Sequence, residues 1–167
     1  MGRRAVLLLS LIAVSVSAAQ GAPQARNGQL LYLRPLGGNN PPFGRLFVAS
    51  PDGTGARDIT PAGIKDVQGA AWSPDGERLV CEGYGVDDPN RNGIYSILAS
   101  DGGGLTRITS NPDGGDIPGD YSPDGAQLVF KRFVDEVPTG MFVVDIAEDG
   151  AGGGEPRGDQ RGRAGLA

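Results

Sequence analysis

The sequence predicts an all-β fold built from repeated β-propeller blades, each with four short antiparallel strands. Two observations support this prediction. A turn motif and its flanking residues return at a fixed spacing, and 29 glycines and 13 prolines divide the 167 residues into short β-favouring runs. The apolar residues show no convincing helical period, which amphipathic helices would require. Self-similarity at a fixed period of this size is typical of solenoids and propellers.

The first repeated motif joins an aromatic residue to a Ser-Pro-Asp-Gly turn. It occurs at residues 72–76 as Trp-Ser-Pro-Asp-Gly and at residues 121–125 as Tyr-Ser-Pro-Asp-Gly, 49 positions later. Proline presets φ for a type I turn, glycine takes the left-handed position that follows, and serine and aspartate hydrogen-bond the backbone. Because apolar runs flank it on both sides, the motif predicts a tight hairpin with a structural role.

A second turn recurs with the same spacing. Asp52-Gly53 and Asp101-Gly102 lie 49 positions apart, and so do Thr60 and Thr109, which follow them. A weaker third copy ends at Asp149-Gly150. Residues 50–53 also spell Ser-Pro-Asp-Gly, but their register assigns them to this second turn. Repeated units with short strands between such turns are typical of propeller blades.

Short strands are expected between the turns, and they amount to about two and a half blades. Most of these strands are runs of five or six residues rich in apolar and β-branched side chains. The predicted strands are residues 29–33, 45–49, 57–60, 68–72, 78–82, 94–99, 105–109, 117–121, 127–132 and 141–146.

The two ends of the chain differ from the repeat. Arg3 and Arg4, an apolar run over residues 5–16 and small residues after it predict a signal peptide over residues 1–19; the alternative is an uncleaved anchor. The partial propeller is then expected over residues 20–150. Residues 151–167 are rich in glycine and almost free of apolar residues, so they are expected to form a disordered tail.

The complete central unit resembles the blades of TolB-type (WD40-like) propellers, which are six-bladed and periplasmic or secreted. The matching features are the Trp72-to-Gly76 turn, Ile94-Tyr95, Asp101-Gly102 and the closing Arg107-Ile108-Thr109. The resemblance covers residues 27–150 and implies an incomplete propeller, because six blades need roughly 250 residues. It also implies a location in the periplasm or outside the cell.

The composition excludes several classes of function. The chain contains no histidine, which removes Ser-His-Asp and Cys-His nucleophile systems and the usual zinc sites. Its net charge of −5 and the lack of a basic stripe argue against binding nucleic acid or an anionic membrane. Cys81 is the only cysteine, so it is expected to be a buried, unreactive thiol. The carboxylate pairs Asp87-Asp88 and Asp135-Glu136 fall in expected hairpin loops, where solvated charge explains them.

One segment resembles half of a calcium-binding loop. Asp88, Asn90 and Asn92 supply side-chain oxygens at alternate positions before Gly93, but Ala99 stands where a bidentate glutamate belongs. The other interpretation is that Asn92-Gly93 is a tight turn and that its polar neighbours solvate the loop. The second interpretation is favoured, and no catalytic, cofactor or metal site is expected.

These features together favour an exported, non-catalytic binding or scaffold module with a protein partner. The exposed terminal blades could also mediate self-association. Two other functions stay open: an accessory propeller fragment of a peptidase or polysaccharide-processing enzyme whose catalytic part lies elsewhere, and a truncated product without function. Fold alone does not decide among them.

Overall fold

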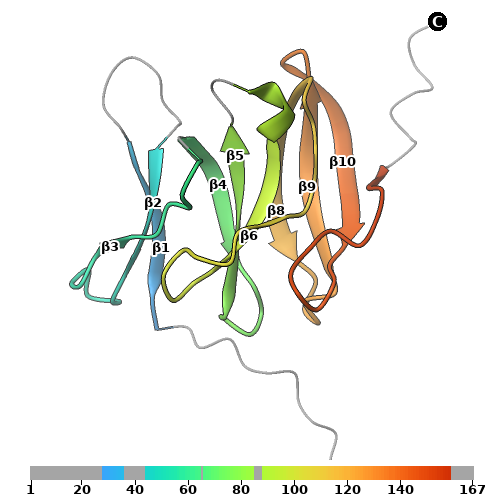
Figure 1. Ribbon diagram of the computed structural model, residues 1–167. Coiled ribbons are helices and arrows are strands. Elements are labelled where there is room, and N and C mark those ends of the chain that lie inside the picture. Colours follow the sequence, from blue (N-terminus) through green and yellow to red (C-terminus); the bar gives the residue numbers. More distant parts are fainter. Residues whose placement is uncertain (1–27, 36–43, 65, 85–87, 159–167) are drawn as a thin grey trace, which may run out of the picture.

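The computed structural model describes residues 28–35, 44–64, 66–84 and 88–158, which form three blades standing side by side in chain order (Figure 1). Every strand pairing in the blades is antiparallel, as expected. Blade 1 contains β1 (Leu30–Pro35), β2 (Gly44–Ala49) and β3 (Arg57–Asp58). Blade 2 contains β4 (Asp66–Trp72), β5 (Arg78–Tyr84), β6 (Gly93–Leu98) and β7 (Thr106–Arg107), with the short 3₁₀ helix η1 (Pro89–Arg91) before β6. Blade 3 contains β8 (Gly114–Tyr121), β9 (Gln127–Val134), β10 (Val137–Asp145) and β11 (Arg157–Gly158).

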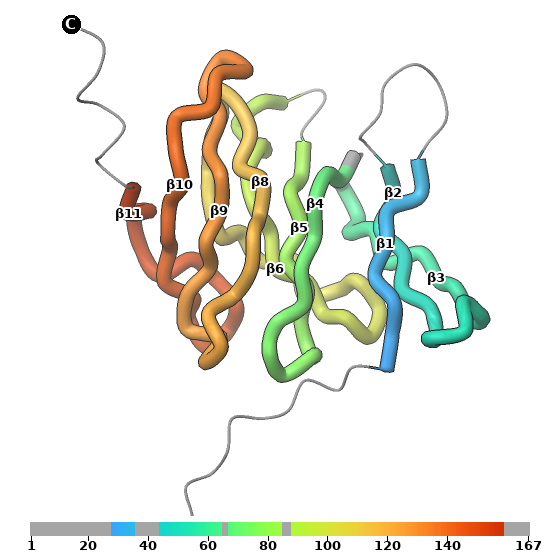
Figure 2. Tube along the Cα trace, turned by 180° about the vertical axis from the view of Figure 1, so that it is seen from behind, coloured from blue at the N-terminus to red at the C-terminus, as the bar shows by residue number. Residues whose placement is uncertain are grey.

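All ten predicted strands are present, with boundaries within a few residues of those expected. The described residues hold two complete blades and three strands of a third, slightly more than the two and a half expected. Blades 1 and 2 are joined into one seven-stranded sheet through a single pair, Gly44 and Val67. Figure 2 shows the three blades from the opposite side, with β4 of blade 2 between β1 and β8.

The expectation of a disordered tail from residue 151 is wrong for residues 151–158. Gly152 bridges to Ile146, and β11 pairs with β10 as the outer strand of blade 3. Arg157 holds Asp145 with two hydrogen bonds of 2.7 Å each. Backbone pairing and a bidentate ion pair order this segment without the apolar residues whose absence suggested disorder. Residues 159–167 and the expected signal peptide lie outside the described residues.

The core consists of two apolar clusters, one at each junction between blades. Cluster 1 lies between blades 1 and 2, and cluster 2 lies between blades 2 and 3. Alternate residues of each strand point to opposite faces, so blade 2 contributes one set of side chains to each junction. The buried members of cluster 1 are Leu46, Val48, Ile59, Ile64, Val67, Leu79, Cys81, Tyr95, Ile97 and Ala99. Those of cluster 2 are Val80, Ile94, Ile108, Leu128, Phe130 and Val144.

Candidate functional site

The two Ser-Pro-Asp-Gly turns make the same hydrogen bonds, which confirms that the motif is structural. Ser73 Oγ donates to Asp75 Oδ1 at 2.5 Å, and Ser122 Oγ donates to Asp124 Oδ1 at 2.6 Å. The first backbone amide of the following strand donates back to each serine hydroxyl at 2.9 Å. The glycines of the two turns have φ of 73° and 74°, the left-handed region that glycine adopts without strain. The turn at residues 50–53 instead joins β2 to β3, as its register predicted.

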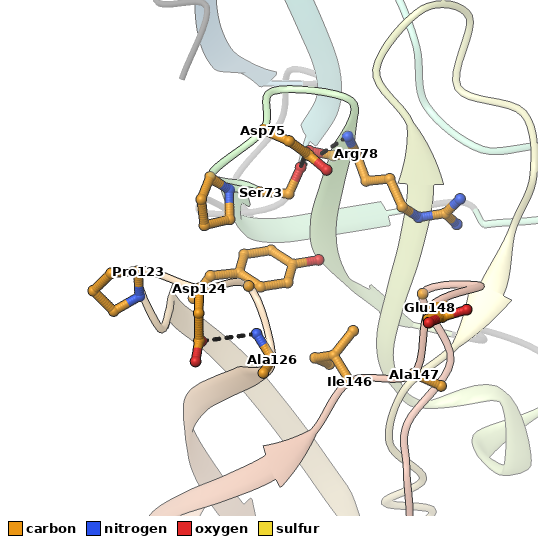
Figure 3. A pocket seen from close by; sticks show the side chains of 13 residues that line it. Ser73, Asp75, Arg78, Pro123, Asp124, Ala126, Ile146, Ala147 and Glu148 are labelled. Atoms are coloured by element: carbon orange, nitrogen blue, oxygen red, sulfur yellow. Dashed lines mark hydrogen bonds between the residues drawn. The ribbon is translucent and has the colours of Figure 1, made fainter. Parts of the chain in front are cut away.

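A hollow of about 340 Å³, here called the lower hollow, lies between these two turns at the junction of blades 2 and 3 (Figure 3). Arg78 lies on its wall and is held in place: its Nε donates to Ser96 Oγ at 2.6 Å and its Nη2 donates to the Gly104 carbonyl at 3.0 Å. Burial raises the pKa of Tyr121, which also lines this hollow, to about 12. The polar groups here therefore take part in packing the two blades together.

The suggested calcium ligands, Asp88, Asn90 and Asn92, all make hydrogen bonds within the protein. Asp88 Oδ1 accepts hydrogen bonds from the Asn90 backbone N at 3.0 Å and from Asn90 Nδ2 at 2.9 Å, so Asp88 caps η1. Asn92 Nδ2 donates to the Gly114 carbonyl of blade 3 at 3.0 Å. The tight turn expected at Asn92-Gly93 is not formed: Asn92 is extended, with φ of −66°, and Gly93 is the first residue of β6, so η1 makes the turn instead. No group of three or more His, Cys, Asp or Glu side chains able to hold a metal ion exists in the described part of the chain.

A second hollow of about 420 Å³, here called the upper hollow, opens at the other end of the same junction, near η1. It lies where β5 ends and β8 begins. The strand β4 of blade 2 contributes Gln68 to its wall, and the strand β8 of blade 3 contributes Ile117. The lining combines aromatic and aliphatic side chains with amide and carboxylate groups. The lining residues are Gln68, Tyr84, Asn92, Gly114, Gly115, Ile117, Phe133 and Glu136.

Glu82 is buried directly beside the upper hollow. Its side chain is fully buried, and neither carboxylate oxygen makes a hydrogen bond of normal geometry. The pKa of Glu82 is raised to about 8, mainly by burial; a hydrogen bond with the Tyr84 hydroxyl lowers it, and the nearby charge of Asp116 raises it. At neutral pH this acid is therefore mostly protonated, which reduces the cost of burying it.

Asp116 is equally buried but fully paired. Arg132 Nε donates to Asp116 Oδ1 at 2.8 Å and Arg132 Nη2 donates to Asp116 Oδ2 at 2.7 Å, in a bidentate pair. Asn111 Nδ2 adds a third hydrogen bond at 3.1 Å. A bidentate guanidinium–carboxylate pair fixes both partners, so it also fixes the position of β8 against β9.

Gly115 permits this close arrangement. A Cβ atom at this position would lie 2.3 Å from the Tyr84 hydroxyl oxygen and 2.6 Å from Glu82 Oε1. No side chain fits there without displacing both groups. Glycine at this position is therefore required by the approach of β8 to β5, since its φ is not in the left-handed region.

The expected carboxylate pairs have different outcomes. Asp87 lies outside the described residues. Asp135 and Glu136 form the two-residue turn between β9 and β10, as expected, but both have positive φ, 49° and 63°. This geometry suits a type I′ turn, which strongly prefers Asn-Gly, so two ordinary side chains here are strained. Glu136 is held at the rim of the upper hollow by this turn.

Cys81 is fully buried in cluster 1, as expected, and burial raises the pKa of its thiol to about 12. A thiol with such a pKa is a poor nucleophile at neutral pH.

The sequence analysis did not identify Glu82, Asp116 or Arg132. One signal was available for Glu82: a single acid at the end of the apolar run Leu79 to Cys81, in a strand expected to be buried. The pairing of Asp116 with Arg132 joins residues 16 positions apart. It could be found only once β8 and β9 had been aligned in register.

The chain matches no protein-family model and no curated protein. It does match solved structures. TolB from Acinetobacter baumannii aligns with a TM-score of 0.57 and 22% identity, over 83% of this chain and 32% of that one. A putative TolB from Agrobacterium tumefaciens aligns with a TM-score of 0.57 and 20% identity, over 78% of this chain and 44% of that one.

The chain thus spans less than half the length of each of these structures. The overlays agree with the repeated turns and with the blades of up to four antiparallel strands described above. The chain has the fold of an incomplete TolB-like β-propeller.

Proposed function

We propose that this chain is an exported, non-enzymatic binding module that holds a segment of a partner protein in the upper hollow. The observation that carries the proposal is the lining of that hollow. Phe133 and Ile117 offer apolar contact, while Gln68 and Glu136 offer hydrogen-bonding groups at the same place. Aromatic side chains beside a few oriented polar groups are typical of recognition sites.

The size of the hollow supports a short segment as the ligand. A volume of about 420 Å³ accommodates one or two side chains of a bound peptide. Glu136, the acid that lines the hollow, favours a segment that presents hydrogen-bond donors. The absence of histidine from the sequence agrees with a binding role.

The strained turn supports the same location. Backbone strain of about 1–3 kcal/mol per residue persists where the surrounding structure over-determines it, and such strain clusters at functional sites. Asp135 and Glu136 carry this strain at the rim of the hollow. An acid retained here at the expense of turn stability is consistent with selection for its side chain.

Export is the second part of the proposal, and it rests on the pattern of residues 1–19. Among the described residues no helix has the length and apolar character needed to cross a bilayer. Mass spectrometry of protein recovered from the envelope or the medium should show a chain that begins near residue 20. Recovery only of an intact cytoplasmic chain would contradict export.

Binding at the upper hollow is tested with displayed peptides. A library of random heptapeptides is selected against the purified chain, and enriched peptides are measured by calorimetry. We expect Phe133→Ala and Glu136→Gln each to weaken binding by tenfold or more, because each removes a contact made inside the hollow. Met141→Ala is the matched control, since Met141 is exposed on the same blade and does not line the hollow. Peptides that bind both hollow variants as tightly as the original chain would place the binding surface elsewhere.

A further inference from the structure

Blade 1 lacks an inner strand among the described residues. In blades 2 and 3 the inner strands β4 and β8 pair with β5 and β9. The strand of blade 1 that corresponds to β5 and β9 is β1, and β1 pairs only with β2. The edge of β1 that would receive an inner strand therefore presents backbone groups without a strand partner in the part of the chain that the structure describes.

The register of the blades shows which residues correspond. The Leu46 backbone N–H donates a hydrogen bond to Thr60 Oγ1 at 2.8 Å. In the same way, the Ile94 backbone N–H donates to Thr109 Oγ1 at 3.0 Å. Leu46 therefore occupies in blade 1 the position of Ile94 in blade 2. Counting along the paired strands from there, Leu30 occupies the position of Leu79.

Burial confirms that β1 lacks the cover that β5 has. Residues 79–83 of β5 are all buried, whereas residues 31–33 of β1 are only half-buried. The difference is largest at the corresponding leucines: Leu30 is 47% exposed and Leu79 is fully buried. In blade 2, Leu79 belongs to cluster 1, so it is covered both by blade 1 and by Trp72 of β4, which pairs with it.

We propose that the open edge of β1 binds an extended segment of a partner protein, which adds antiparallel to β1 as the missing inner strand. Strand addition of this kind gains affinity from backbone hydrogen bonds and specificity from alternate side chains. The site is separate from the upper hollow, so this inference goes beyond the function proposed above.

The inner strands already present define the chemistry of the segment. Both end in an aromatic residue, Trp72 and Tyr121, opposite Leu79 and Leu128. In β4 the small residues Gly69 to Ala71 precede the aromatic residue, and the space there is tight: a Cβ at Gly69 would lie 3.3 Å from Ile117 of the next inner strand. The segment should therefore be extended, with small residues followed by an aromatic side chain that covers Leu30.

The test uses the chain's own inner strand as the probe. A synthetic peptide with the sequence of residues 66–75, labelled at its amino end, is added to the purified full chain. We expect saturable binding by fluorescence anisotropy and at least tenfold slower amide exchange within residues 30–35. Substituting aspartate for the tryptophan of the peptide should weaken binding by tenfold or more. Methylating alternate peptide nitrogens on the pairing edge should abolish it, because the ladder needs those donors.

Amide exchange of β1, measured before the peptide is added, shows whether the chain itself or a second copy of it already covers the edge. Slow exchange at those amides of residues 30–35 that point away from β2, if it does not depend on protein concentration, would mean that the chain covers its own edge. Protection that rises with protein concentration, together with a larger mass by light scattering, would mean that a second copy does so. Either result overturns the proposal, and so does fast exchange that the peptide leaves unchanged. Leu30→Lys is a variant that should still fold, because Leu30 is exposed. It should weaken binding of the peptide by tenfold or more.

Discussion

The two junctions between blades use corresponding positions but differ sharply in polarity. Val67 of β4 pairs with Gly83, and Asp116 of β8, 49 positions later, pairs with Arg132. Val67 belongs to the apolar cluster between blades 1 and 2. Asp116 instead forms an ion pair with Arg132 of the same blade, near the buried acid Glu82 of blade 2.

This difference shows that a blade can form without a polar side chain at the position of Val67 and Asp116. The apolar junction stabilises the fold by burial alone. The polar junction replaces part of that burial with an ion pair and the buried acid Glu82, which contribute little to stability or reduce it. Polar groups are concentrated near the upper hollow, in agreement with the binding proposed there.

Exchanging the two corresponding residues should have the largest effect. Val67→Asp places an acid opposite Gly83 with no guanidinium to pair it, so it should lower the free energy of unfolding by about 3–5 kcal/mol. Asp116→Val leaves Arg132 without its carboxylate and should cost about 2–3 kcal/mol. Urea denaturation followed by circular dichroism measures both.

Asp116→Asn is the control that keeps the shape of the side chain while removing its charge. A Val67→Asp variant within 1 kcal/mol of the original chain would mean that water reaches the first junction. The two junctions would then not differ in the way described.

Glu82 should make the second junction sensitive to pH. Its pKa is raised to about 8 in the folded chain, above the ordinary value of 4.5. Between these values the folded chain holds a proton that the unfolded chain has lost, so stability is fully present below about 4.5 and falls as pH rises to 8. The free energy of unfolding should decrease by up to about 1.4 kcal/mol per pH unit in this range.

Glu82→Gln isolates this contribution from all other titrations. The difference between the variant and the original chain, measured by urea denaturation at pH 5, 6, 7 and 8, should grow in favour of the variant. Glu82→Leu should behave in the same way, because Leu33 occupies the corresponding position in blade 1. A difference that stays constant across this range would show that Glu82 has an ordinary pKa.

The smallest effect is expected at the strained turn. Replacing Asp135-Glu136 by Asn-Gly supplies the residues that a type I′ turn prefers, and should raise the free energy of unfolding by about 1 kcal/mol. The same change should weaken peptide binding at the upper hollow, since it removes the Glu136 carboxylate. Thermal melts and the calorimetric assay give the two readouts. If the Asn-Gly variant is less stable, the contacts of the Asp135 and Glu136 side chains stabilise the fold by more than the backbone strain destabilises it.

The sequence was sufficient to predict the repeating part of the fold. The turns at residues 72–76 and 121–125 specify their own hydrogen bonds locally, so their spacing gave the blades and ten of the strands. β11 was missed because Arg157 is held by Asp145, a contact that local composition does not reveal. The polar junction was missed for a related reason: Glu82, Asp116 and Arg132 meet only after three strands from two blades have been packed in register.

The outer strands carry a consequence for solubility. β3, β7 and β11 have two residues each, so every blade ends in an edge that offers another chain very few backbone groups. Exposed strand edges are templates for aggregation, and very short ones give a second molecule too little to add to. The outer rim of these blades is thus protected against stacking with other sheets by the brevity of its last strands.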